Sequence, residues 1–175
     1  ADVLVNAANE RLAPGGGVCG ALFAGAGYDR MAEACARIGG CPTGRAVATP
    51  GFDLPCRWVV HAVGPVWRGG SHGERDALRS CYRSVFAEAE RLGVRSVAYP
   101  LVSAGIYGFP VDEALAIAFG VEVESVEEAF SQLDNEELEE VLSEKAIAYA
   151  RSHRGDIEVS EDSFGEDDMD DDYDY

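Results

Sequence analysis

Val3-Leu4-Val5-Asn6-Ala7-Ala8-Asn9, followed after a short gap by Pro14-Gly15-Gly16-Gly17, is the stretch that decides the fold of this chain. Its first three residues are apolar and include two β-branched valines, a pattern typical of a buried strand. The glycine-rich residues then lead into a helical pattern of apolar residues that begins near Cys19. A buried strand, a glycine-rich loop and a helix in this order predict an α/β domain.

The remaining apolar patterns alternate between strands and helices in the same way. Short apolar runs predict strands at residues 46–49, 58–63 and 94–102. A helical spacing of apolar residues predicts helices at 19–38, 74–92 and 112–119, the first of them broken near Gly25 and Gly27. Because the strands are apolar on both faces, helices must cover both sides of the sheet. The pattern therefore favours an α/β layered fold with a mostly parallel or mixed sheet.

The acidic charge is confined to the end of the sequence. The 175 residues carry a formal net charge of −18, yet residues 1–120 contain 11 acidic and 11 basic side chains. The remaining 55 residues contain 21 acidic and 3 basic side chains, and so hold the whole excess. We therefore expect a neutral globular domain over 1–120 and an acidic segment over 121–154, with helices near 126–133 and 136–151. A disordered acidic tail is expected over 155–175.

Composition and charge also exclude several classes of function. No basic stripe offsets the repulsion between this acidic chain and phosphate backbones, so no nucleic-acid partner is expected. No apolar run approaches the roughly 18 residues that cross a bilayer, and residues 1–9 lack the pattern of a secretory leader. The five cysteines are odd in number and form no Cys-x-x-Cys pair, which predicts free thiols and no metal site. We expect a cytoplasmic monomer without membrane partner or cofactor.

Two glycine-rich loops, at residues 14–17 and 103–108, each follow a predicted strand or its polar extension. Ligands of open α/β sheets bind outside the carboxyl ends of the strands. Glycine lets backbone N–H groups approach a ligand closely, and several N–H groups beside a helix N-terminus form an anion site. One such loop alone would more often be an ordinary turn. Two of them favour a ligand site that holds a diphosphate.

Four motifs in this order resemble the macrodomain family. They are Val5–Asn9, Gly15–Gly20, Val60–Pro65 and Ser103–Gly108, spread over residues 2–120. The resemblance is nearest to the branch that hydrolyses ADP-ribosyl groups. It implies a three-layer α/β/α fold with a mixed sheet, which binds ADP-ribose or an ADP-ribosylated protein at the strand ends. It also implies that the first family strand, with the acid that contacts the adenine amino group, is absent from this sequence.

The resemblance assigns ligand contacts to particular residues. Asn9 is matched to the asparagine that hydrogen-bonds the distal ribose, although an asparagine here also suits a turn. Tyr107 is matched to a residue that flanks the same ribose. His61, by contrast, lies within a strand and is expected to be buried and hydrogen-bonded rather than a base. The full set of expected ligand contacts is Asn6, Asn9, Gly16, Gly17, Val18, Ser103, Ala104, Gly105, Ile106 and Tyr107.

Two positions depart from the hydrolase branch. The branch has an aspartate that positions and activates water, where this chain has Cys19, and a histidine four residues later, where this chain has Phe23. A cysteine thiol is mostly protonated at neutral pH and is a poor substitute for a carboxylate. The catalytic candidates are therefore Asn9 and Cys19, the latter in the place of the aspartate. Loss of a positioned base predicts a rate lower by about 10²–10⁴.

Three functions remain compatible with these residues. The first is a module that binds ADP-ribose or mono-ADP-ribosylated protein without efficient catalysis. The second is a weakened hydrolase of ADP-ribosyl or O-acetyl-ADP-ribose bonds, in which Asn9 and the substrate's own phosphate activate water. The third is a degenerate domain that binds no ligand and serves as an interaction scaffold.

Overall fold

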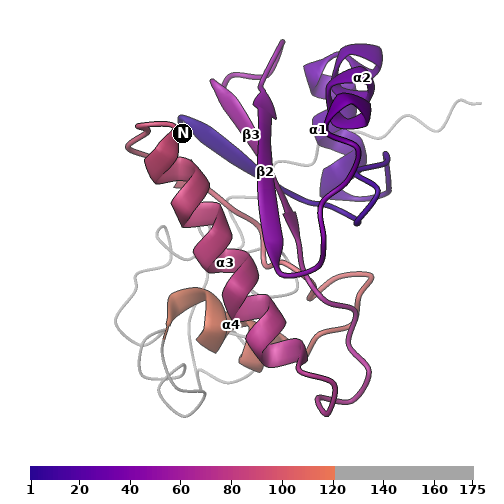
Figure 1. The fold of residues 1–175 in the computed structure, drawn as a ribbon, viewed down its shortest axis with the longest axis vertical. Coiled ribbons are helices and arrows are strands. Elements are labelled where there is room, and N and C mark those ends of the chain that lie inside the picture. Colours follow the sequence, from indigo (N-terminus) through magenta and orange to yellow (C-terminus); the bar gives the residue numbers. More distant parts are fainter. Residues whose placement is uncertain (121–175) are drawn as a thin grey trace, which may run out of the picture.

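Residues 1–120 are the part of the chain described by the structure, a computed structural model. They form a four-stranded sheet with helices on both faces (Figure 1). The strands are β1 Val3–Ala7, β2 Arg45–Pro50, β3 Trp58–Val63 and β4 Val97–Ala98. The helices are α1 Val18–Ala26, α2 Tyr28–Ile38, α3 Glu74–Arg91 and α4 Val111–Phe119. The acidic helices predicted over 121–154 and the tail predicted over 155–175 lie outside the described residues.

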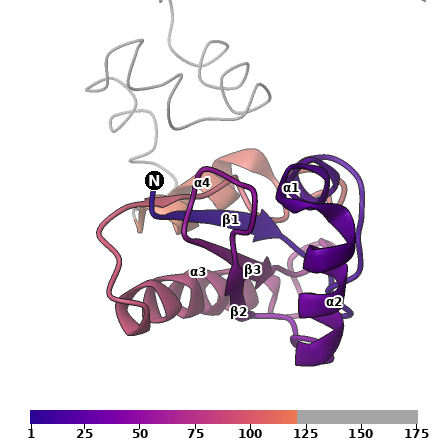
Figure 2. The same ribbon diagram turned by 90° about the horizontal axis from the view of Figure 1, so that it is seen from above.

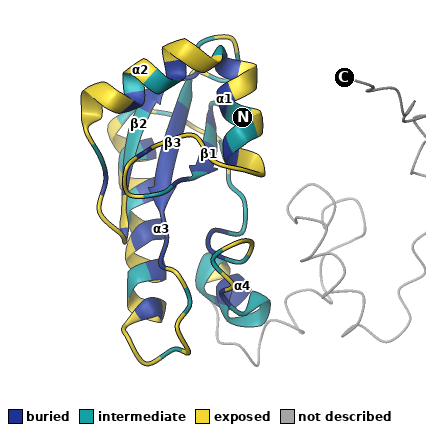
Figure 3. Ribbon diagram, turned by 90° about the vertical axis from the view of Figure 1, so that its right-hand side faces the viewer, coloured by how far each residue is buried: buried dark blue, intermediate teal, exposed yellow. Residues whose placement is uncertain are grey.

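The sheet is mixed and has the order β2-β3-β1-β4. Strand β1 runs parallel to both β3 and β4, while β2 pairs with β3 in the antiparallel sense. Ala7 is paired with Ala62, so the carboxyl ends of β1 and β3 lie at the same edge of the sheet. These two strands are buried along most of their length (Figure 3), as their apolar sequences predict.

Helices cover both faces of the sheet and form two separate cores. Helices α1 and α2 pack on one face, where Phe23 and Met31 are buried against Val59. Helices α3 and α4 pack on the other face, where Leu78 is buried against Val60. Successive residues of β3 serve opposite cores because side chains alternate across a strand. Figure 2 shows α2 and α3 on opposite sides of the strands. The predicted three-layer α/β/α fold with a mixed sheet is confirmed.

The predicted strand over residues 94–102 is wrong for most of its length. Only Val97 and Ala98 pair, with Val3 and Leu4 of β1. Pro100 has no N–H to continue the ladder, and residues 100–107 instead line a cavity. The predicted break in the first helix is correct at Gly27, where φ is +85°, but Gly25 lies within α1.

All five cysteines lie in residues 1–120 and are free thiols, as expected from their spacing. Cys19, Cys35, Cys41 and Cys81 are buried, and Cys56 is half-buried. Burial, with a smaller contribution from Cys19, raises the pKa of the Cys35 thiol to about 11. Buried thiols of this kind pack as small neutral groups. Within residues 1–120, no helix has the length and apolar character needed to span a bilayer.

Candidate functional site

A cavity of about 440 Å³ opens at the carboxyl end of β1, between the two glycine-rich loops. Nine of the ten predicted ligand contacts line it, and so does the catalytic candidate Cys19. The predicted contact that does not line it is Asn6, which is 1% exposed. Gly15 also lines the cavity; it lies in the predicted loop 14–17 but is not among the ten expected contacts. Sequence reasoning missed several apolar residues of the wall, because apolar side chains give no signal of ligand binding on their own. These additional lining residues are Ala7, Ala8, Pro100, Leu101, Val102 and Val111.

The first loop brings the N-terminus of α1 to the cavity wall. Helix α1 begins at Val18 without a side-chain cap, and its first intrahelical bond runs from the Ala21 N–H to the Gly17 carbonyl at 3.1 Å. The backbone N–H groups ahead of Ala21 therefore have no partner within the helix. A Cβ at Gly20 would lie 2.8 Å from the Gly15 carbonyl oxygen, so glycine lets the loop pack directly on the helix. The helix N-terminus adds partial positive charge at this wall.

The second loop is held in a strained turn. Ser103 has φ +69°, a conformation that costs a non-glycine residue about 1–2 kcal/mol. Its carbonyl accepts the Phe109 N–H at 3.0 Å, and the Gly105 carbonyl accepts the Gly108 N–H at 3.0 Å. Within residues 1–120, no protein acceptor receives the N–H groups of Gly105, Ile106 and Tyr107, and the Ser103 hydroxyl, which is buried, also has no partner. Both loops thus offer unpaired backbone donors to one cavity.

Asn9 shapes the turn that follows β1 and also lines the cavity. Its Oδ1 accepts the backbone N–H groups of Arg11 and Ala13, each at 3.1 Å, and its Nδ2 donates to the Ala13 carbonyl at 2.8 Å. An amide nitrogen carries two protons, so one remains for a ligand. The turn-forming interpretation and the ligand-binding interpretation of Asn9 therefore apply together.

A buried polar network lies beneath the cavity. The Asn6 Nδ2 is 3.1 Å from His61 Nδ1 and donates to Cys19 Sγ at 3.6 Å. The Cys19 thiol in turn donates to the Ala13 carbonyl at 3.9 Å. Cys19 is thus the member of this network that reaches the cavity wall, while Asn6 supports it from below. Phe23, at the position of the branch histidine, is fully buried.

His61 is a structural residue at the centre of this network. It is 1% exposed, and its Nε2 lies 2.9 Å from Thr49 Oγ1. Burial lowers the pKa of the imidazole to about 4, which keeps the ring neutral at physiological pH. Because Asn6 Nδ2 is a donor, Nδ1 accepts and Nε2 carries the proton. The expectation of a buried, hydrogen-bonded histidine is confirmed.

This shifted pKa predicts a pH dependence of stability. Between the ordinary value of 6.5 and about 4, the unfolded chain binds a proton at His61 that the folded chain does not. The neutral His61 imidazole contributes fully to folding stability above pH 6.5, and this contribution is lost as the pH falls toward 4. Denaturant unfolding at pH 7 and pH 5 should differ by about 2 kcal/mol from this residue alone. His61→Gln should remove that difference. If the variant shows the same difference between pH 7 and pH 5 as wild type, His61 is not its source.

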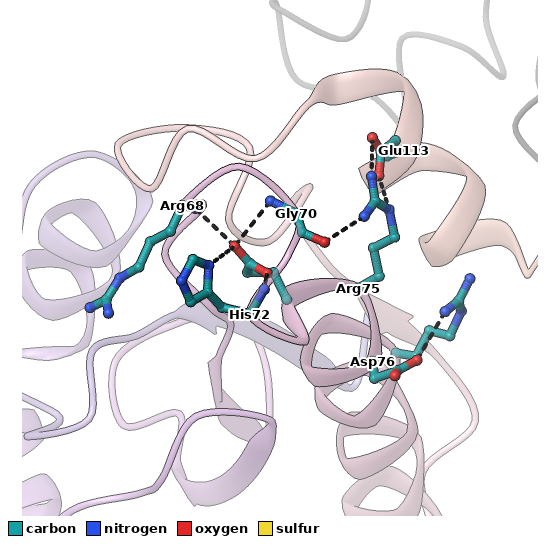
Figure 4. A network of polar contacts seen from close by, with 8 residues as sticks. Arg68, Gly70, His72, Arg75, Asp76 and Glu113 are labelled. Atoms are coloured by element: carbon teal, nitrogen blue, oxygen red, sulfur yellow. Dashed lines mark hydrogen bonds and ion pairs between the residues drawn. The ribbon is translucent and has the colours of Figure 1, made fainter.

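The loop at residues 67–73 contacts the second loop at Tyr107. The Trp67 N–H donates to the Tyr107 carbonyl at 2.9 Å. The Glu74 carboxylate accepts the backbone N–H groups of Arg68, Gly70 and His72 (Figure 4). Burial of Glu74 opposes ionisation, but these hydrogen bonds outweigh it and lower the pKa to about 2. The loop is therefore fixed by a carboxylate that stays charged.

The Arg75 side chain ties the same loop to α4. Its guanidinium forms two hydrogen bonds with the Glu113 carboxylate, at 2.5 and 2.9 Å, and donates to the Gly70 carbonyl at 2.9 Å (Figure 4). It also stacks over Trp67, 5.2 Å from the ring centroid. A guanidinium suits this position because its planar group can donate hydrogen bonds at its edge while its face stacks on an aromatic ring.

The known proteins that this chain resembles share one domain. The family model described as Macro domain matches residues 5–118. A macro domain-containing protein of Chlorobaculum tepidum is 51% identical over 117 residues, which cover 67% of each chain. One of Ralstonia nicotianae is 47% identical over 134 residues, which cover 77% of this chain and 75% of that one.

Solved structures give the same result and add bound nucleotides. The Oceanobacillus iheyensis macrodomain with ADP aligns with a TM-score of 0.68 and 31% identity, over 87% of this chain and 82% of that one. The Trypanosoma brucei macrodomain in complex with ADP-ribose aligns with a TM-score of 0.65 and 37% identity, over 86% of this chain and 62% of that one. The matched family model, the identities and the shared fold agree, and this chain belongs to the macrodomain family.

Proposed function

We propose that this protein binds ADP-ribose, either free or attached to a protein, and acts as a binding module rather than an efficient enzyme. The observation that carries the proposal is the cavity between residues 15–19 and 100–107, which both glycine-rich loops line with unpaired backbone donors. Further support comes from the similar macrodomain structures that hold ADP and ADP-ribose.

The geometry suits a diphosphate flanked by a ribose. The N-terminus of α1 and the loop that carries the unpaired N–H groups of Gly105, Ile106 and Tyr107 line the same cavity, and each supplies donors for phosphate oxygens. We assign the distal ribose to the part of the cavity that Asn9 and Tyr107 line, where Asn9 keeps one amide proton. Vicinal hydroxyls both donate and accept, which matches an amide and a phenol.

The surroundings of Cys19 favour binding over hydrolysis. A general base needs a free lone pair directed at the attacking water. The Cys19 sulfur instead accepts the Asn6 amide and directs its proton to the Ala13 carbonyl. Neither contact leaves a strong acceptor at the cavity. We therefore propose that the chain binds ADP-ribosyl groups and cleaves ADP-ribosyl bonds only slowly.

Calorimetry of the full chain with ADP-ribose tests the proposal, and Gly105 supplies a charge probe. A Cβ at Gly105 would meet no atom within 4 Å, and its φ lies outside the left-handed region, so a side chain is accommodated. Gly105→Glu should weaken ADP-ribose binding about tenfold or more, because it places a carboxylate beside the phosphates. Gly105→Gln, of the same size without the charge, should lose much less.

Stability should be the same for the two Gly105 variants, which makes the comparison independent of folding. Wild type that takes up no ADP-ribose at millimolar concentration would refute the proposal and leave the scaffold hypothesis. Equal losses in the glutamate and glutamine variants would show that the phosphates do not lie beside this loop.

A further inference from the structure

We infer that a second cavity, next to the ADP-ribose pocket, is a docking cleft for an acidic segment of the protein that carries the ADP-ribose. This inference rests on the proposed function and adds a partner of stated chemistry to it. The second cavity has a volume of about 500 Å³ and lies between the turn after β1, the loop after β3 and the start of α3. Its lining includes Asn9, Tyr107, Arg11 and Arg68.

The two cavities meet at the residues assigned to the distal ribose. Asn9 and Tyr107 line both of them. In a mono-ADP-ribosylated protein the modified side chain is bonded to the distal ribose. A ligand seated in the first cavity would therefore present its protein-bearing end to the second. The neighbouring residues of that protein would be the first groups to enter it.

The side chains of the second cavity leave two arginines available. Arg11 and Arg68 are exposed, and neither has an ion-pair partner within residues 1–120. The two acids of the lining keep their charge but accept hydrogen bonds from neutral groups and pair with neither arginine. Glu10 accepts the Thr43 N–H and hydroxyl at 3.0 and 2.8 Å. Glu74 is buried beneath the backbone N–H groups that it binds.

Both arginines are anchored through their backbones close to the junction. The Arg11 N–H donates to Asn9 Oδ1 at 3.1 Å. The Arg68 N–H donates to Glu74 at 3.0 Å, and the preceding residue, Trp67, donates to the Tyr107 carbonyl. The Arg68 side chain extends away from Gly70 and Arg75 (Figure 4). Each arginine thus belongs to a wall that also holds one of the two junction residues.

Guanidinium groups in this setting select carboxylates. Arginine presents planar pairs of N–H donors that match a carboxylate, and both charges remain permanent at neutral pH. A segment with two acidic side chains near the modified residue would pair with both arginines. A basic segment would meet the same arginines with repulsion.

Calorimetry of the full chain with three probes tests this inference. The probes are free ADP-ribose and two mono-ADP-ribosylated peptides with the same stable linkage, one with acidic and one with neutral flanking residues. Wild type should bind the acidic peptide about fivefold more tightly than the neutral one, a preference that 0.5 M salt removes. The double variant Arg11→Gln/Arg68→Gln should lose the preference and keep its affinity for free ADP-ribose. Arg83→Gln, which removes an exposed arginine of α3 that does not line this cavity, is the matched control.

The outcomes separate this inference from the proposed function. Equal affinity of wild type for the two peptides, or an equal loss in the Arg83 control, would overturn the docking cleft while ADP-ribose binding stands. No binding of free ADP-ribose would overturn the proposed function, and the docking cleft with it.

Discussion

Replacing Cys19 by aspartate is expected to raise the rate of ADP-ribosyl hydrolysis by about 10²–10⁴ over wild type. The side chain at this position already reaches the cavity, and the Asn6 amide 3.6 Å from the sulfur would become a donor to the new carboxylate. The uncapped N-terminus of α1 stabilises a negative charge in its first turn. Turnover of a mono-ADP-ribosylated protein, measured at saturating substrate, reports the effect.

Cys19→Asn separates the base from the shape of its side chain. Asparagine has the size of aspartate but supplies no base, so this variant should stay at the wild-type rate. ADP-ribose affinity should change little in either variant, because the donors of both loops remain. Wild-type turnover within tenfold of the aspartate variant would contradict the binding-module proposal and favour the hydrolase alternative.

The strands and helices with strong apolar patterns could be predicted from the sequence. Strand β3 and helix α3 begin where their apolar patterns begin. The strand is decided by burial of both its faces, and the helix by burial of one apolar stripe. The segment 94–102 shows the limit of this reasoning. Its apolar residues are partly buried, yet pairing with β1 extends over only Val97 and Ala98. Apolar character predicts burial, whereas strand length depends on a neighbour far away in the sequence.

The parts of the candidate site that consist of loop motifs could be predicted from the sequence. The parts formed by residues far apart in the sequence could not. The glycine loops could be identified from their residues, and they line one cavity. Asn6 was expected beside the ligand, but strand alternation turns it toward His61, beneath the cavity. Arg11 and Arg68 lie 57 positions apart in the sequence, and no local pattern indicates that they line one cleft. Tertiary contacts alone bring them together.

Gly64→Ala is expected to destabilise the protein by about 1–3 kcal/mol, the range for overpacking a close contact. Gly64 follows β3, and a Cβ there would lie 2.2 Å from Ser103 Oγ and 2.6 Å from Val102 Cγ1. Both atoms belong to side chains at the start of the second loop, and Val102 is buried, so these side chains or the loop that carries them must shift. Because that loop supplies donors to the cavity, ADP-ribose affinity should fall about tenfold as well. Denaturant unfolding and calorimetry measure the two effects.

Two companion variants show whether the contact with Ser103 is the cause. Gly105→Ala makes the same chemical change in the second loop, where a Cβ would meet nothing within 4 Å, and should leave stability nearly unchanged. Ser103→Gly in the Gly64→Ala background removes the closest clashing atom and relieves the backbone strain at φ +69°, so it should recover part of the lost stability. If the double variant is less stable than Gly64→Ala alone, the damage arises elsewhere and Gly64 is not what holds the second loop in place.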